Sequence, residues 1–226
     1  MSSLFEPLPI RFEGRFADEH LVDAKALSES LAGMNRLVNT SMFMLERWRV
    51  PSKRQSAPIR VMASPPAEGS YEFLVHVLSA DGMLPVVADI IANRGQELVW
   101  RMLSTTLLFN SNKERDVEPH FTELMRLTQD LRQDRNASEE RHFALIKELA
   151  LSNRNASSRF VANVGYDANK LLLPLGDSVT EIDIESAEII REKGEVSVGE
   201  LSKFRCHVDG LKRHNRALTV QLDVTP

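Results

Sequence analysis

The sequence predicts an α+β protein: a small antiparallel sheet packed by a long helix, followed by a helical region and a C-terminal all-β unit. Three observations support this class. Short apolar–polar alternations flank one long helical stripe near the N-terminus. Residues 96–164 contain no glycine and one proline, which is typical of successive helices. After Gly176 the segments become short, β-branched and punctuated by glycine.

The N-terminal part predicts a strand, a helix and two further strands. Residues 10–16 alternate in polarity, which indicates a first strand. Asp23 is a suitable N-cap, and we expect the helix to stop near Val50 because Pro51 disfavours helical geometry in the residue before it. Its residues at alternating spacings of four and three form one apolar stripe interrupted by a serine: Leu27, Leu31, Met34, Val38, Ser41, Leu45 and Trp48. Residues 57–63 and 70–79 read as two strands joined by the turn "SPPAEG".

The stretch from Asp81 to Phe109 is mostly apolar, but charged residues recur about once per turn, so it is too polar for a membrane span. As a helix it has one core face, formed by Leu84, Val87, Ile91, Leu98, Met102 and Phe109. Trp100 and Leu107 project instead among polar residues. We therefore predict that this flank meets another subunit or a partner protein, and we add Trp48 to this interface. The alternative is that later helices of the same chain cover it.

The chain is predicted to divide at residue 177 into an α+β and helical domain (1–176) and a small β unit (177–226). The second unit is predicted to have about four strands, too few to close on itself. Either its strands extend the first sheet, or the chain is cut from a longer protein whose small barrel continues.

Two segments carry a family resemblance. "IRFEGRFADEHLVDAKALSESLAGMNRLVN" (Ile10 to Asn39) resembles the opening of a family of uncharacterised bacterial proteins, and "GELSKFRCHVDGLKRHNRALTVQLD" (Gly199 to Asp223) resembles the first part of that family's small five-stranded β-barrel. The resemblance implies a bacterial protein with an α+β domain and a barrel truncated in this chain. It implies no activity, so it transfers no functional residue.

No motif predicts catalysis, a cofactor or a metal, and we name no residue for any of them. The six histidines lack the spacing of a metal clamp, and the nucleotide-binding and nucleophile motifs are absent. Cys206 reads as a buried structural thiol. Glu181, Asp183 and Glu185 would share one face of a strand and could hold magnesium, although such a row is more often the solvated side of a half-buried strand.

A basic run lies near the C-terminus. The segment from Glu200 to Arg216 contains five basic and two acidic residues, which gives it a net charge of +3. On a small barrel these cations could bind phosphates of a nucleic acid, although only Phe204 could stack on a base. The predicted phosphate-binding residues are Lys203, Arg205, Lys212, Arg213 and Arg216.

The expected function is therefore binding without catalysis. The 226-residue chain is 42% hydrophobic, carries a net charge of −4 and has one cysteine, which fits a cytoplasmic protein without disulfides or membrane attachment. We predict a scaffold or accessory subunit of a bacterial multi-protein assembly that self-associates or binds a partner protein. The alternatives are a nucleic-acid-binding protein, an enzyme whose site is assembled from distant residues, and a component of an anti-phage defence system.

Overall fold

The computed structural model describes residues 3–52, 55–57, 59–64, 71–79, 85–129, 139–194, 206–212 and 217–222. These residues belong to two compact units, Met1–Glu195 and Val196–Pro226.

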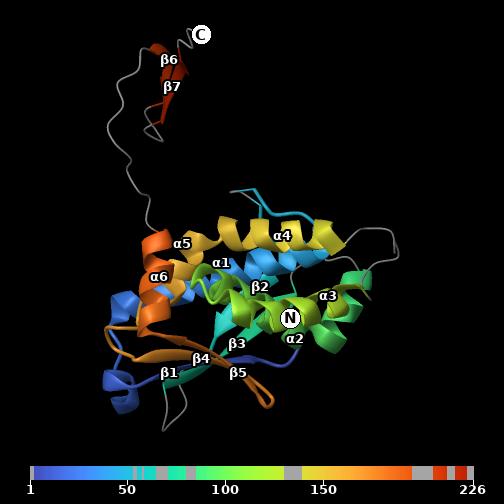
Figure 1. Ribbon diagram of the computed structural model, residues 1–226, viewed down its shortest axis with the longest axis vertical. Coiled ribbons are helices and arrows are strands. Elements are labelled where there is room, and N and C mark those ends of the chain that lie inside the picture. The colour runs from blue at the N-terminus through green and yellow to red at the C-terminus, as the bar shows by residue number, and fades with distance from the viewer. Residues whose placement is uncertain are drawn as a thin grey trace. The chain divides into compact units, whose positions relative to one another are not determined.

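The first unit contains a five-stranded open sheet in which every pair of neighbouring strands is antiparallel. The strand order is β2 (Ile59–Ala63), β3 (Tyr71–Ser79), β1 (Leu8–Glu13), β4 (Lys170–Leu175) and β5 (Ser178–Asp183). The helices lie together on one side of this sheet (Figure 1). The predicted mixed class with a small antiparallel sheet is therefore confirmed.

Alternation in the sequence explains which face of the sheet is covered. Leu8, Ile10 and Phe12 are buried, whereas the intervening residues of β1 are only partly buried. The predicted first strand is correct in place but ends at Glu13, because Gly14 takes a positive φ of 87° and turns the chain into a short 3-10 helix, η1 (Arg15–Glu19). Positive φ is cheap only for glycine, so the strand stops where the sequence allows a turn.

Helix α1 (Ala24–Arg47) confirms the predicted long helix beside the sheet. The Asp23 side chain accepts a hydrogen bond from Ala26 N at 2.9 Å, as expected of an N-cap. The helix ends three residues before Val50, because Trp48 adopts a left-handed conformation and its N–H bonds the carbonyl of Met44.

Helix α2 (Pro85–Asn110) is the central helix, in contact with β4 and β5 of the sheet, with α1 and with the helices that follow it in the chain. From Leu98 to Leu108 its residues are buried on every side except at Arg101. Leu98 and Met102 occupy the core as predicted. The side chains of residues 85–92 are outside the described part.

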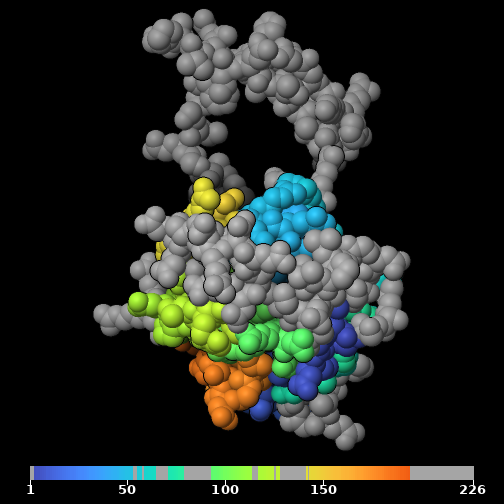
Figure 2. All heavy atoms as spheres, turned by 90° about the vertical axis from the view of Figure 1, so that its right-hand side faces the viewer, coloured from blue at the N-terminus to red at the C-terminus, as the bar shows by residue number. Residues whose placement is uncertain are grey.

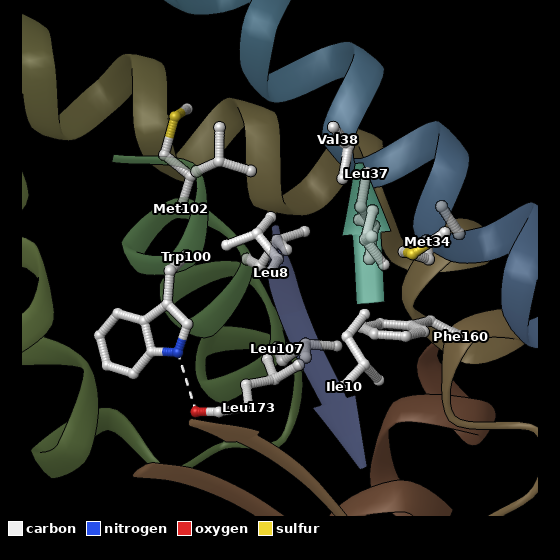
Figure 3. Packing of buried hydrophobic residues seen from close by; sticks show 14 of the residues in the cluster. Leu8, Ile10, Met34, Leu37, Val38, Trp100, Met102, Leu107, Phe160 and Leu173 are labelled. Atoms are coloured by element: carbon white, nitrogen blue, oxygen red, sulfur yellow. Dashed lines mark hydrogen bonds between the residues drawn. The ribbon is translucent and has the colours of Figure 1, made fainter. Parts of the chain in front are cut away.

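Trp100 and Leu107 also lie in the core, so the prediction that they form an exposed flank is wrong. They are 1% and 0% exposed, and the indole Nε1 donates to the carbonyl of Leu173 at 2.8 Å (Figure 3). The indole ring also contacts His120 of the helix after α2, with ring centroids 5.2 Å apart. The chain thus covers this flank itself, which is the alternative left open by the sequence.

The remaining helices complete the cover of α2. They are α3 (Glu114–Gln129), α4 (Glu139–Ser152), α5 (Arg154–Phe160) and α6 (Ile184–Gly194). On the face shown in Figure 2, the green to yellow-green residues of α2 and α3 lie between the cyan end of α1 and the orange β4–β5 hairpin. No helix among the described residues is long and apolar enough to cross a membrane.

Residues 178–194 belong to the first unit, so the predicted boundary at residue 177 falls inside it. Strand β5 extends the first sheet through a tight turn at Gly176, as one of the two alternatives expected. Residues 184–194 form a helix where a strand was predicted. Asp183 starts that helix by accepting a hydrogen bond from Ser186 N at 2.8 Å. Burial alone would raise the pKa of Asp183, but its hydrogen bonds with Ser186 and Lys113 outweigh burial and lower it.

The second unit gives no support for the predicted barrel. Its described residues form one antiparallel hairpin, β6 (Cys206–Lys212) paired with β7 (Ala217–Leu222), with an irregularity between Val208 and Gly210. Two strands leave both edges open, whereas a barrel requires closure of the sheet.

The hydrogen bond of Trp100 gives a prediction about stability. Trp100→Phe removes the donor and leaves the carbonyl of Leu173 buried, so we expect a loss of about 2 to 3 kcal/mol in the free energy of unfolding. Urea denaturation with an unchanged m-value measures it. Tyr166→Phe, at a side chain that is 66% exposed, is the control and should change stability by less than about 0.5 kcal/mol. Equal effects of the two substitutions would contradict a buried, bonded indole.

Candidate binding surface beside helix α1

Two segments far apart in sequence are hydrogen-bonded beside the start of α1. The Arg15 guanidinium donates to the carbonyl of Tyr166 at 3.0 Å and also to that of Gly165. Ala17 N donates to the carbonyl of Asp167 at 2.9 Å. The carboxylate of Asp167 in turn accepts from Asp23 N at 2.9 Å. The η1 segment, the 165–167 loop and the first turn of α1 therefore form one connected frame.

The frame contains an unusual density of left-handed backbone. Gly14 and Gly165 have φ of 87° and 93°, and the non-glycine residues Arg15 and His20 have φ of 52° and 62°. A residue with a Cβ in this region costs of order 1 kcal/mol. The surrounding hydrogen bonds hold these residues in that conformation. Strain of this kind gathers at functional sites more often than elsewhere.

The same frame exposes three large apolar or aromatic side chains. Phe16, Leu21 and Tyr166 are 56%, 59% and 66% exposed. Leu21 N donates to the carbonyl of Phe16 at 2.9 Å, and the neighbours of Phe16 are bonded to the 165–167 loop, so the three residues lie on adjoining backbone. We call these three residues the rim. Tyrosine and phenylalanine are enriched in protein interfaces, because they bury much area at low entropic cost.

Tyr166 also lines a cavity of about 500 Å³ that lies between α1, α5, the 165–167 loop and α6. We call it the α1–α5 pocket. Its volume lies in the range of small-ligand sites. Charged side chains of both signs line it: Lys25, Arg159, Arg191, Asp23, Glu29 and Asp167.

Helices α1 and α5, which both contribute to the pocket wall, also pack closely against each other. A Cβ on Gly33 of α1 would lie 2.5 Å from both the carbonyl oxygen of Ala156 and the amide nitrogen of Phe160. Only glycine permits the two backbones to approach this far. Because only residues 161–164 separate α5 from the 165–167 loop, the position of Tyr166 depends on that contact.

Asn163 joins the loop to α1. Its carbonyl accepts the N–H groups of Tyr166, Asp167 and Ala168 at 3.2, 3.0 and 3.1 Å. Its side-chain amide, fully buried, donates to the hydroxyl of Ser30 at 3.0 Å. The loop is thus wrapped around one residue that is itself bonded to α1, which keeps the pocket wall in place.

The charged groups of the pocket are engaged to different degrees. Asp23 caps α1 and Asp167 accepts the Asp23 N–H. Arg191 donates to the carbonyls of Val161 and Val164 and lies 5.6 Å from the Tyr166 ring centroid. Asp167 also acts on Tyr71, whose pKa is raised by burial and, to a smaller extent, by this carboxylate.

The side chains of Lys25 and Arg159 have no hydrogen bond or ion pair with any part of the chain that the structure describes. Both side chains are exposed. Two cations therefore line the pocket with their donor capacity unused.

The predicted interface and phosphate-binding residues do not come together here. Trp100 and Leu107 are buried in the core, and Trp48 follows the C-terminal end of the 24-residue α1, about 36 Å along the helix from Asp23. Lys212 is the last residue of β6. The other four predicted phosphate ligands, at 203, 205, 213 and 216, lie outside the described residues, so their predicted role stays a prediction.

Sequence reasoning missed the rim and the pocket. The predicted first strand runs to Phe16, which places this residue in the sheet and not on the rim. The one available signal was Gly14–Arg15, where the strand alternation reaches a glycine before an exposed Phe16. Nothing in the sequence brings Tyr166 next to it, since 150 residues separate Arg15 from Gly165.

No group of three His, Cys, Asp or Glu side chains in the described part of the chain is placed to hold a metal ion. Glu181, Asp183 and Glu185 do not form one row, because Asp183 starts α6 and Glu185 lies in its first turn.

The family can be recognised from most of the chain. A family model described as "Domain of unknown function (DUF7946)" matches residues 8–191, which include all five strands of the sheet, the rim and the pocket. The chain belongs to this DUF7946 family. The predicted membership of an uncharacterised family is thereby confirmed. No curated protein and no solved structure matches the chain significantly.

The contact at Gly33 gives a second prediction. Gly33→Ala should destabilise the DUF7946 domain by about 1 to 3 kcal/mol, because the added Cβ overlaps the backbone of α5. At an ordinary helix position a Gly→Ala change stabilises the fold by up to about 1 kcal/mol. The sign of the change in the free energy of unfolding, measured by urea denaturation, therefore tests the close contact. Stabilisation would show that α1 and α5 are not in close contact.

Backbone strain at the rim gives a third prediction. His20→Gly should stabilise the fold by about 0.5 to 1 kcal/mol, since glycine takes φ of 62° without a Cβ penalty. The imidazole is exposed, and no contact that would offset this gain is found among the described residues. Ser28→Gly, at an exposed position inside α1, is the matched control and should destabilise by several tenths of a kcal/mol. A loss of stability in both variants would argue against strain at His20.

Proposed function

We propose that this DUF7946 protein is a non-enzymatic binding subunit that docks a partner protein through the rim residues Phe16, Leu21 and Tyr166. The proposal keeps the functional class that the sequence predicted. It moves the interface away from Trp100 and Leu107, because buried residues cannot meet a partner.

One observation carries the proposal: three large apolar side chains, each more than half exposed, lie on a frame held by backbone hydrogen bonds. Scattered exposed apolar residues are ordinary on protein surfaces. Here they adjoin one another, and one of them, Tyr166, lines a pocket that contains two arginines. Aromatic residues and arginine are the residues most enriched in binding hot spots.

The rigidity of the frame supports the same conclusion. Arg15 bonds two carbonyls of the 165–167 loop, and Arg191 holds the end of α5 while it contacts the Tyr166 ring. A surface that is already ordered loses less conformational entropy on association. Arg15 and His20 adopt unfavourable positive φ angles next to Phe16 and Leu21. We infer that this backbone strain is tolerated because it holds the two apolar side chains in a fixed arrangement.

Self-association remains one form of this proposal, with a second copy as the partner. Nucleic-acid binding through the basic residues 203–216 and a role in anti-phage defence stay predictions from the sequence, since no contact in the described residues favours them.

Site-specific photo-crosslinking in the source organism tests the proposal. A photoreactive phenylalanine replaces Phe16 or Tyr166 in the full chain, and we expect the same crosslinked protein from both positions. Phe143, an exposed aromatic residue of α4, is the matched control and should not yield that product. A product containing only this chain, twice its mass, would identify a second copy.

Loss of the rim should remove the product without unfolding the protein. In the chain labelled at position 16, Tyr166→Asp should reduce the crosslinked protein at least about tenfold, as expected for a hot-spot tyrosine. The proposal is wrong if positions 16 and 166 yield nothing or yield the same mixture as position 143.

A further inference from the structure

Two cationic side chains of the α1–α5 pocket have hydrogen-bond donors that no described residue engages. Lys25 offers three donors and Arg159 five, and neither group has a partner among the described residues. On the acceptor side, Asp23 already caps α1 and Asp167 already accepts the Asp23 N–H. The Glu29 side chain also lines the pocket and has no hydrogen bond or ion pair among the described residues, so free acceptors stand beside the free donors. A ligand that engages Lys25 and Arg159 brings acceptor oxygens.

Charge limits how many negative charges that ligand can carry. Three cations and three carboxylates line the pocket, so their formal charges cancel. Asp23, Glu29 and Asp167 repel any anion, and they repel a dianion such as phosphate more strongly than a single carboxylate. The two free cations can neutralise the one charge of a carboxylate. Arginine also matches a carboxylate geometrically, because its planar guanidinium can donate two parallel hydrogen bonds.

One wall of the pocket is suited to an apolar neighbour of that carboxylate. Tyr166 is 66% exposed, and the Arg191 guanidinium lies over its ring, 5.6 Å from the centroid. An aromatic or aliphatic side chain that packs on this ring would continue onto Phe16 and Leu21, which lie on the adjoining backbone. A peptide with an acidic residue next to an apolar one presents both features together.

We propose that the α1–α5 pocket binds the carboxylate of a glutamate or aspartate side chain in the partner protein, with an adjacent apolar side chain on Tyr166. Arg159 and Lys25 donate to the carboxylate. The inference rests on the proposed function and names the chemistry of the partner. It assigns Lys25 and Arg159 a role that no other contact in the described structure explains.

An NMR titration of the full ¹⁵N-labelled chain tests the inference. The probes are N-acetyl-Phe-Glu-amide, its isosteric partner N-acetyl-Phe-Gln-amide and inorganic phosphate. We expect the glutamate peptide to shift amide signals of residues 23–29 and 158–167. Its affinity should exceed that of the glutamine peptide at least about tenfold, since the charge-assisted hydrogen bonds are lost in the amide.

Variants assign the effect to the pocket. Lys25→Gln/Arg159→Gln should abolish the preference for glutamate over glutamine. The matched control Lys147→Gln/Arg154→Gln removes two equally exposed cations outside the pocket and should retain it. Amide spectra without a probe show whether each variant is folded.

Three outcomes would overturn the inference: equal affinity for the two peptides, no shift with either peptide up to about 10 mM, or phosphate binding tighter than the glutamate peptide. The crosslinking experiment separates this failure from failure of the proposed function. If Lys25→Gln/Arg159→Gln leaves the crosslinked product unchanged, the rim binds a partner and the pocket does not contribute a carboxylate contact.

Discussion

The close approach of α1 and α5 at Gly33 is the constraint on which the candidate surface depends. With no Cβ at this position, the backbone of α5 lies against α1 near Ala156 and Phe160. Only residues 161–164 separate α5 from the 165–167 loop, which therefore emerges beside the first turn of α1. A larger residue at position 33 would move the loop away from Asp23 and open the pocket wall.

The hydrogen-bonded frame of η1, the 165–167 loop and the first turn of α1 then fixes the rim residues on the protein surface. The buried amide of Asn163 links the loop to Ser30, and Arg15 links it to the end of β1. Each bond joins segments more than 100 residues apart, so the rim exists only when the whole first unit is folded. A binding surface built in this way is coupled to the stability of the core, because loss of the α1–α5 contact also removes the arrangement of Tyr166.

Sequence reasoning succeeded where the signal was local and periodic. The N-cap at Asp23, the stripe along α1 and the alternation of β1 and β3 all follow from neighbours within one or two turns. It failed at residues 184–194, where β-branched residues suggested a strand. Asp183 caps that segment and makes it a helix, and the buried Ala187 and Ile190 then pack at helical spacing. Intrinsic preference is weak enough for such a cap and such packing to override it.

The sequence alone determined the class of the protein, the long helix beside a small antiparallel sheet and the membership of an uncharacterised family, because these depend on periodicity and capping over short spans. Only the tertiary structure decided that Trp100 is a core residue and that Phe16 and Tyr166 share a surface. Periodicity around one helix says which side chains share a face but not what covers that face. A helix buried on every side, like the Leu98–Leu108 part of α2, therefore looks from its sequence like one that awaits a partner.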